Sequence, residues 1–241
     1  MTSRFVLVHG AYHGAWYWER FTPLLNAAGA AVSAPDLPGH GDDMTPSADL
    51  TLPLYADRVA DAVRAMDGPV TLAGHSMAGA VIAEVAERVP DLLTRLVYLT
   101  AYMPGTGETI ADWAKQDTAT KAIGQRIDYE GAACLTMDRA AAHEAFYREA
   151  TETDMDWIFP KLRPEPLAIF RHALSLTPEN FGSVPRDYIS CRGDLAITAA
   201  LQDAMLSALP ARRVWRMDCS HSPQLVAAAE LVDILMEGEA G

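Results

Sequence analysis

A serine set among small residues is the first candidate for chemistry in this chain of 241 residues. Ser76 lies within Gly74-His75-Ser76-Met77-Ala78-Gly79, between an apolar run at residues 70–73 and a helical pattern over residues 81–89. This arrangement is typical of a nucleophile elbow, a strand-to-helix turn so sharp that only small neighbours fit and the hydroxyl is pushed clear of the sheet. The usual spacing is G-x-S-x-G, whereas the fifth position here is Ala78, which is also small.

A serine hydroxyl is a poor nucleophile at neutral pH, so it needs an adjacent base and a carboxylate that orients the base. Asp194 follows an apolar run at residues 188–191, and His221 follows one at residues 214–217. Because the carboxyl ends of parallel strands meet at one edge of a sheet, we expect Ser76, Asp194 and His221 to converge. The order Ser, Asp, His is the one found in strand-and-helix hydrolases with such an elbow.

Each of these assignments has a structural alternative. Ser76 could simply start a helix, Asp194 could be a turn or capping residue, and His221 could lie in a surface loop. Asp187 and Asp218 compete for the role of the carboxylate. Three residues of the right types and order at strand ends are nevertheless a far more specific signal than the elbow alone, and they favour acyl-transfer chemistry.

Acyl transfer through a tetrahedral intermediate also needs an oxyanion hole. One donor should be the backbone N–H after the nucleophile, which belongs to Met77, and the other should come from the loop after the first strand. That loop, residues 9–12, contains Gly10, which leaves room for the substrate, and we expect the Ala11 N–H to be the second donor. A plain glycine turn is the alternative.

Short apolar runs alternate with helical periodicity over most of the chain and must position these residues. The strand-like runs are at residues 4–8, 31–34, 70–73, 96–100, 188–191 and 214–217. Helical patterns cover residues 18–28, 55–66, 81–89, 198–208 and 222–236. Such alternation predicts an α/β fold in which a parallel sheet is covered by helices on both faces.

The pattern changes at residues 103–176, which contain helical pieces around 110–115 and 139–149 and no strand-like run of the earlier type. We expect a cap inserted between two halves of the core, residues 1–102 and 177–241, over the carboxyl edge of the sheet, where ligands bind. Its aromatic residues and methionines could wall an apolar pocket, or they could be packing within the cap. The pocket candidates are Gly10, Tyr12, Met103, Trp113, Trp157, Phe159 and Leu176.

Bulk properties exclude several classes of partner. The formal net charge of −13 argues against nucleic acid and against anionic membrane surfaces. No run of 18 uninterrupted apolar residues and no signal peptide is visible, so we expect a cytoplasmic protein without membrane contact. Cys134, Cys191 and Cys219 are odd in number and widely spaced, which predicts buried free thiols rather than disulfides or a metal site.

The first loop and its surroundings resemble one known group of enzymes. The run His9-Gly10-Ala11-Tyr12-His13-Gly14-Ala15-Trp16-Tyr17-Trp18 is similar to the H-G-A-x-H-G-x-W-x-W opening of the plant methylesterase and hydroxynitrile lyase branch of the α/β-hydrolase superfamily, and the resemblance returns at residues 179–189. It implies a six-stranded, mostly parallel core with a lid, no cofactor or metal, and ester hydrolysis by a serine triad. Related enzymes are often homodimers. The family's triad and oxyanion positions fall on the residues chosen above.

Two positions separate esterases from lyases within this branch. Lyases carry a threonine where this chain has Gly10, and a lysine that stabilises departing cyanide where this chain has Ser222. Without that cation, cyanide would leave as an anion in an apolar pocket, which is costly. The sequence therefore predicts a carboxylic-ester hydrolase acting on a small, largely apolar ester. Lactone, amide or C–C hydrolysis, cyanohydrin cleavage, and a non-catalytic binder of small molecules are the alternatives.

Overall fold

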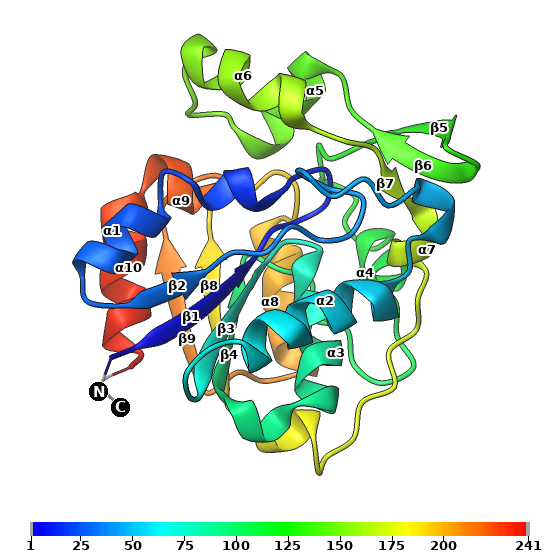
Figure 1. Ribbon diagram of the computed structural model, residues 1–241. Coiled ribbons are helices and arrows are strands. Elements are labelled where there is room, and N and C mark those ends of the chain that lie inside the picture. The colour runs from blue at the N-terminus through cyan, green and yellow to red at the C-terminus, as the bar shows by residue number, and fades with distance from the viewer. Residues whose placement is uncertain (1, 240–241) are drawn as a thin grey trace.

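A six-stranded sheet runs through the centre of the protein, whose residues 2–239 are described by a computed structural model (Figure 1). Its strands are β1 (Arg4–Val8), β2 (Ala31–Ser33), β3 (Val70–His75), β4 (Leu93–Leu99), β8 (Arg186–Cys191) and β9 (Arg213–Met217). Their spatial order is β2-β1-β3-β4-β8-β9, and every pairing is parallel. The predicted α/β fold with a mostly parallel, six-stranded sheet is confirmed.

The central strands are apolar because helices cover both faces of the sheet. All residues of β3 are buried, whereas the edge strand β9 alternates between partly exposed and exposed positions until Met217. Continuous apolar runs are typical of such doubly covered parallel strands. The three cysteines, at positions 134, 191 and 219, are free and buried, as predicted.

The helices of the core lie on both sides of the sheet, with α1 contacting α10 on one side and α2 contacting α3 on the other (Figure 1). They are α1 (Thr22–Ala27), α2 (Leu52–Arg64), α3 (Ala78–Arg88), α8 (Ala199–Ala208), α9 (Pro223–Val226) and α10 (Ala228–Glu237). Single 3₁₀ turns are η1 (Ala15–Trp18), η2 (Ser47–Asp49), η3 (Pro90–Leu92) and η5 (Phe181–Ser183). The predicted helix at residues 18–28 is in fact η1 followed by α1, and the predicted closing helix is broken between α9 and α10, where Ala227 leaves helical geometry.

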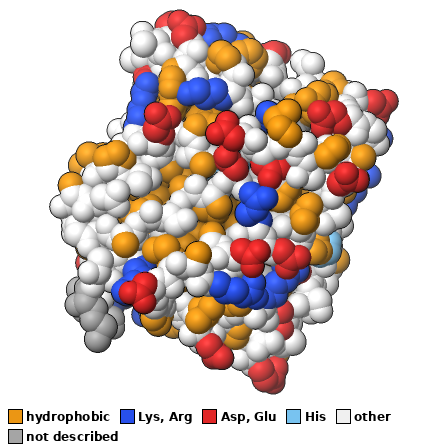
Figure 2. All heavy atoms as spheres, viewed as in Figure 1, with side chains coloured by type: hydrophobic (Ala, Val, Ile, Leu, Met, Phe, Trp, Pro, Cys, Tyr) orange, Lys and Arg blue, Asp and Glu red, His pale blue; other side chains and the backbone are white. Residues whose placement is uncertain are grey.

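The segment between β4 and β8, residues 100–185, is called the insertion below. It contains α4 (Ile110–Ala114), β5 (Gln125–Tyr129), β6 (Ala132–Thr136), α5 (Arg139–Phe146), α6 (Glu152–Ile158), η4 (Phe159–Lys161), β7 (Glu165–Pro166) and α7 (Leu167–Phe170). Much of it, α5, α6 and the three strands, lies beyond one end of the sheet (Figure 1). Figure 2 shows acidic and basic side chains interspersed over the visible face of both parts.

The insertion also contains a small antiparallel sheet, β5-β6-β7, although its sequence has no apolar run like those of the core strands. β5 and β6 form a hairpin whose turn residues Glu130 and Gly131 both have positive φ, 47° and 79°. Such turns match the twist of paired strands. The residues of β5 are mostly exposed and polar, so they leave no apolar run in the sequence.

The loops after β1 and β3 meet at a reversal of the strand order. β1 lies between β2 and β3, so the chain leaves β1 toward one side of the sheet and later leaves β3 toward the other. In open α/β sheets a crevice forms at such a point beyond the carboxyl ends of the strands, and ligands bind there. Among residues 2–239, no helix combines the length and the apolar composition needed to span a bilayer.

Candidate active site

Ser76 occupies the turn between β3 and α3 with a φ of 57°, a left-handed conformation that residues other than glycine seldom adopt. Its N–H donates to the carbonyl of Leu99 at 3.3 Å. Its carbonyl accepts from the N–H groups of Gly79 and Tyr102 at 3.2 and 3.0 Å. The neighbouring strand and the start of the insertion therefore hold the backbone of this residue in a strained conformation.

The two glycines of the turn are required by close approach. A Cβ atom on Gly74 would lie 2.8 Å from the carbonyl oxygen of Ala78, and one on Gly79 would lie 1.9 Å from that of Tyr102. Ala78 itself is buried at the start of α3 and accommodates its methyl group. The need for glycine thus falls on Gly79, one position later than in the usual five-residue spacing.

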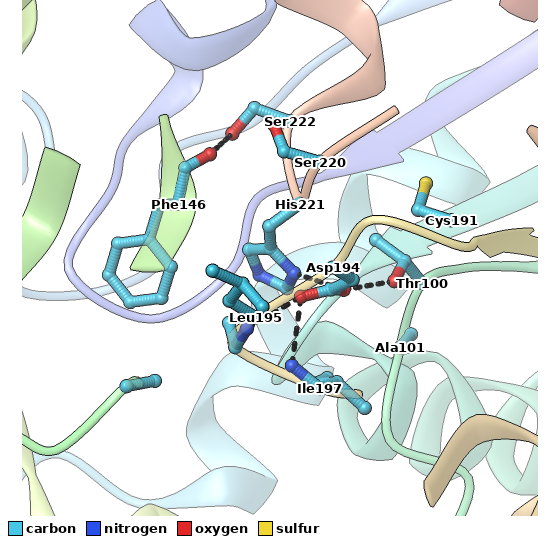
Figure 3. Close-up of polar contacts among 12 residues, drawn as sticks. Thr100, Ala101, Phe146, Cys191, Asp194, Leu195, Ile197, Ser220, His221 and Ser222 are labelled. Atoms are coloured by element: carbon cyan, nitrogen blue, oxygen red, sulfur yellow. Dashed lines mark hydrogen bonds and ion pairs between the residues drawn. The ribbon is translucent and has the colours of Figure 1, made fainter. Parts of the chain in front are cut away.

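Asp194 and His221 lie in contact beyond the ends of β8 and β9 (Figure 3). Nδ1 of His221 lies 2.7 Å from Oδ2 of Asp194, which also accepts from the hydroxyl of Thr100. The other oxygen, Oδ1, accepts from the N–H groups of Ala196 and Ile197 at 2.7 and 2.9 Å. Four donors therefore satisfy a carboxylate that is only 2% exposed. Because Nδ1 donates to this carboxylate, Nε2 of His221 is the nitrogen left to accept a proton.

The two competing aspartates are engaged elsewhere. Asp187 is buried and accepts from Arg95 at 2.8 Å and from Arg212 at 3.0 and 2.8 Å. Asp218 is exposed and pairs with Arg192 at 3.0 Å. Of the three candidates, Asp194 is the one whose carboxylate contacts His221.

An apolar cavity of about 220 Å³ lies between the carboxyl edge of the sheet and the insertion. Ser76 and His221 both line it. The other lining residues are Ala11, Tyr12, His13, Met77, Tyr102, Ala111, Ala114, Ala122, Leu135, Phe146, Leu167, Phe170, Ala196 and Ile197. This set contains no lysine, arginine or carboxylate, so the cavity favours an uncharged ligand.

Of the predicted pocket residues, Tyr12 lines the cavity and Gly10 lies beside it. A Cβ atom on Gly10 would be 2.9 Å from Cβ of Ser76, so this glycine keeps room next to the serine. Met103, Trp113, Trp157, Phe159 and Leu176 are absent from the lining.

Tertiary contacts explain the position of these five residues. Trp113 is buried, and its indole N–H donates to Glu108 at 2.8 Å. Trp157 packs edge-on against Trp16 with ring centroids 5.6 Å apart, and Lys161 Nζ lies 3.5 Å from its ring centroid. Met103 is buried, while Phe159 and Leu176 pack at the margin of the core. These five side chains therefore serve packing, and the part of the cavity wall that α4 contributes consists of two alanines.

Two residues that line the cavity, Ala11 and Met77, have a backbone N–H group without a partner. Among residues 2–239, the N–H groups of Ala11 and Met77 have no hydrogen-bond acceptor. The neighbouring backbone groups do have partners. The carbonyl of Ala11 accepts from Nδ1 of His13 at 2.5 Å, and the N–H of Tyr12 donates to Glu165 at 3.2 Å. Met77 directly precedes α3, so its N–H group lies at the positive end of the helix dipole. Such a pair of donors can bind a developing oxyanion.

Buried histidines surround the site in their neutral form. Nδ1 of His13 donates to the carbonyl of Ala11, and its Nε2 contacts the hydroxyl of Tyr147. Burial lowers the pKa of His13 to about 3. Nε2 of His75 donates to the backbone carbonyl of His221 at 2.8 Å, and burial, followed by the nearby His221, lowers the pKa of His75 well below its usual range.

Sequence reasoning missed several supporting residues. Thr100 carries a recognisable signal, since it is a hydroxyl residue directly after the strand that pairs with β8. Ser222, at the position of the lyase lysine, is buried and does not line the cavity. Its hydroxyl donates to the carbonyl of Phe146 (Figure 3) and lies 2.8 Å from the hydroxyl of Tyr17. No pattern in the sequence points to Glu165, which contacts the first loop from the insertion.

The fold and site can be compared with known proteins. The α/β hydrolase family matches residues 5–234 of the chain. Methylesterase 2 of Arabidopsis thaliana is 31% identical over 97% of this chain and 95% of its own length. A longer, chloroplastic relative of the same plant is 29% identical over 98% of this chain, which spans 64% of that protein.

The solved structures agree with this assignment. A methylesterase from Arabidopsis, MES16, has a TM-score of 0.87 to this protein at 26% identity, covering 99% of both chains. The chain therefore belongs to the α/β-hydrolase family, within the branch of carboxylesterase-type hydrolases that contains the plant methylesterases.

Proposed function

We propose that this protein hydrolyses small, largely apolar carboxylic esters through Ser76 as nucleophile, His221 as general base and acid, and Asp194 as the residue that orients His221. The observation that carries the proposal is the shared cavity, which Ser76 and His221 line together. Nδ1 of His221 donates to the carboxylate of Asp194, which accepts four hydrogen bonds in all. The methylesterases among the relatives support the same class of reaction.

In the acylation step, Oγ of Ser76 attacks the ester carbonyl carbon while its proton passes to Nε2 of His221. The new O–C bond turns the carbonyl oxygen into an oxyanion, which the N–H groups of Ala11 and Met77 stabilise. The tetrahedral intermediate collapses by breaking the bond to the alcohol oxygen, which takes the proton from His221. Asp194 stabilises the imidazolium between these two transfers.

Deacylation repeats the sequence with water in place of the serine. Nε2 of His221 removes a proton from water as the water oxygen bonds to the acyl carbon. The second intermediate then releases the carboxylic acid and returns the proton to Ser76. The reaction consumes one ester and one water molecule and yields one acid and one alcohol.

The cavity lining supports an uncharged aliphatic or aryl group on the substrate. Alanines from α4 and the side chains of Leu135, Leu167 and Phe170 form apolar walls, whereas charged groups would lose their hydration without gaining a partner. The same lining is unfavourable for cyanohydrin cleavage, because none of its residues is a lysine or arginine that could stabilise departing cyanide.

An assay with p-nitrophenyl acetate and butyrate tests the proposal. The wild type should hydrolyse both esters, and Ser76→Ala should lose about 10³-fold or more of kcat/KM. Mandelonitrile, a lactone, an amide and an aryl methyl ester, assayed in parallel, distinguish the alternative reactions on the same residues. Wild-type protein without esterase activity, or a Ser76→Ala variant that keeps it, would overturn the proposal.

A further inference from the structure

Glu165 is a fully buried carboxylate that connects the insertion to the first loop of the core. It lies on β7 and is 0% exposed. Oε2 accepts from the backbone N–H of Tyr12 at 3.2 Å, and Oε1 accepts from the hydroxyl of Tyr55 at 2.9 Å. Nε2 of His40 lies 3.0 Å from Oε2. A buried carboxylate is stable only when such partners replace water.

Tyr12 is held by the insertion at both of its backbone polar groups. Its N–H donates to Glu165, and its carbonyl accepts from the N–H of Arg163 at 2.9 Å. Tyr12 has a φ of 72°, a left-handed conformation that is unfavourable for a residue with a side chain. The strained conformation therefore depends on the two contacts from residues 163 and 165.

His40 supplies the charge that balances Glu165. Its Nδ1 lies 3.0 Å from the carbonyl of Pro38, to which it donates. Nε2 must then also carry a proton, because an unprotonated nitrogen would repel the carboxylate. Burial alone would lower the pKa of His40, but the attraction of Glu165 raises it above its usual value.

The peptide group between Ala11 and Tyr12 carries this constraint to the reaction centre. The N–H of that peptide group donates to Glu165, and its carbonyl accepts from His13, so its plane is fixed on both sides. The free N–H of Ala11 is one peptide group away, and Ala11 lines the cavity. We therefore expect a rotation at Tyr12 to turn the Ala11 N–H away from the carbonyl oxygen of a bound ester.

We propose that Glu165, paired with His40, is a positioning residue that holds Tyr12 in its left-handed conformation and thereby aims the Ala11 N–H at the oxyanion, so that the insertion is part of the catalytic apparatus. This inference rests on the proposed esterase function for its effect on rate. Its structural part, the constraint on residues 9–14, does not depend on any activity.

Glu165→Gln, which keeps the shape of the side chain and removes its charge, is the principal variant. It should lower kcat for p-nitrophenyl butyrate by about 10-fold to 100-fold, because small displacements of catalytic groups have effects of this size, and it should leave KM nearly unchanged. The affinity for butylboronic acid, which adds to a catalytic serine and places an oxygen in the oxyanion hole, should fall by a similar factor. Hydrogen exchange at the Tyr12 amide should become faster.

Glu87→Gln is a matched control, since Glu87 accepts four hydrogen bonds from Thr177, Asn180 and Phe181, none of which lines the cavity. It should keep wild-type kcat, boronic acid affinity and exchange at Tyr12. If Glu165→Gln does not fold, Glu165→Asp decides, because it keeps the charge beside His40 but is one methylene too short to reach both Tyr12 and Tyr55.

The outcomes separate this inference from the proposed function. Esterase activity that is lost in Ser76→Ala but unchanged in a folded Glu165 variant overturns the inference and leaves the function standing. A wild type without esterase activity overturns the function, and exchange at Tyr12 then still decides the inference. If hydrogen exchange at the Tyr12 amide stays at the wild-type rate in the Glu165 variant, the inference is contradicted whether or not the protein is an esterase.

Discussion

The hydroxyl of Thr100 donates to Oδ2 of Asp194, the same oxygen that accepts from Nδ1 of His221. A hydrogen bond to a charged group contributes about 1.5–3 kcal/mol. Thr100→Val removes it while keeping the β-branched shape, so the carboxylate should hold His221 less firmly. We expect kcat/KM for p-nitrophenyl butyrate to fall about 10-fold, as measured by steady-state kinetics.

Thr100→Ser is the control for this prediction. It keeps the hydroxyl group and loses one methyl group, so it should retain kcat/KM within about threefold of the wild type. Equal losses in both variants would show that packing, rather than the hydrogen bond to Asp194, accounts for the effect.

The geometry of the elbow predicts that substitution is tolerated at Ala78 but not at the adjacent Gly79. A Cβ atom on Gly79 would clash with the carbonyl oxygen of Tyr102, whereas Ala78 already fits. Gly79→Ala should therefore lower the free energy of unfolding by about 3 kcal/mol or more, since a backbone atom must move. Ala78→Gly should lower it by no more than about 1 kcal/mol, the usual helix-propensity difference. Urea denaturation of both variants measures this, and similar losses would contradict the account of the turn.

Stability should fall in mild acid because buried histidines stay neutral in the folded protein. Burial lowers the pKa of His13 to about 3 and lowers the pKa values of His9 and His75 well below 6.5. The unfolded chain therefore takes up protons below about pH 6.5 that the folded protein does not bind, so stability is lost as pH falls through this range. His40, whose pKa is raised, acts in the opposite sense, and its contribution is lost as pH rises.

His13→Asn isolates one of these contributions. Between pH 6.5 and pH 4, the free energy of unfolding of the wild type should decrease more steeply than that of the variant, by roughly 1 kcal/mol per pH unit. Urea titrations at several pH values give both slopes. Parallel pH dependences would mean that His13 is protonated in the folded state as readily as in the unfolded chain.

The size of the cavity should set the preferred length of the acyl chain. Ala114, on α4, lines it, and Ala114→Phe would fill part of its volume of about 220 Å³. The rate with p-nitrophenyl butyrate should fall about 10-fold relative to the rate with p-nitrophenyl acetate, because each methylene in a pocket is worth roughly 1–3 kcal/mol. The acetate rate is the internal control, and an unchanged butyrate-to-acetate ratio would place the acyl group elsewhere.

The core of the fold could be predicted because the burial of its strands determines which residue types occur in them. Parallel strands covered on both faces must be apolar throughout, and polar residues directly after them must lie at one edge of the sheet. Those two rules led to Ser76, Asp194 and His221. Their catalytic roles, and the division of the chain at residues 103 and 176, stay predictions.

The secondary structure of the insertion and the side chains that it turns toward the cavity are harder to predict, because both depend on tertiary contacts. The strand β5 pairs on one side and is largely exposed, so its residues are polar and do not form an apolar run. Trp157 packs against Trp16 and does not line the cavity, whereas alanines of α4, which carry no distinctive signal, do line it. Which side of a short helix faces inward is decided by the path of the whole segment.

Labelling with a fluorophosphonate tests the central claim, that Ser76 is the nucleophile, most directly. The reagent phosphonylates activated serines and mimics the tetrahedral intermediate. We predict that wild-type protein gains the mass of one phosphonyl group, that peptide mapping places it on Ser76, that esterase activity disappears in step with labelling, and that Ser76→Ala is not labelled. Loss of activity with Ser76 unmodified, or the same labelling in Ser76→Ala, would contradict the account.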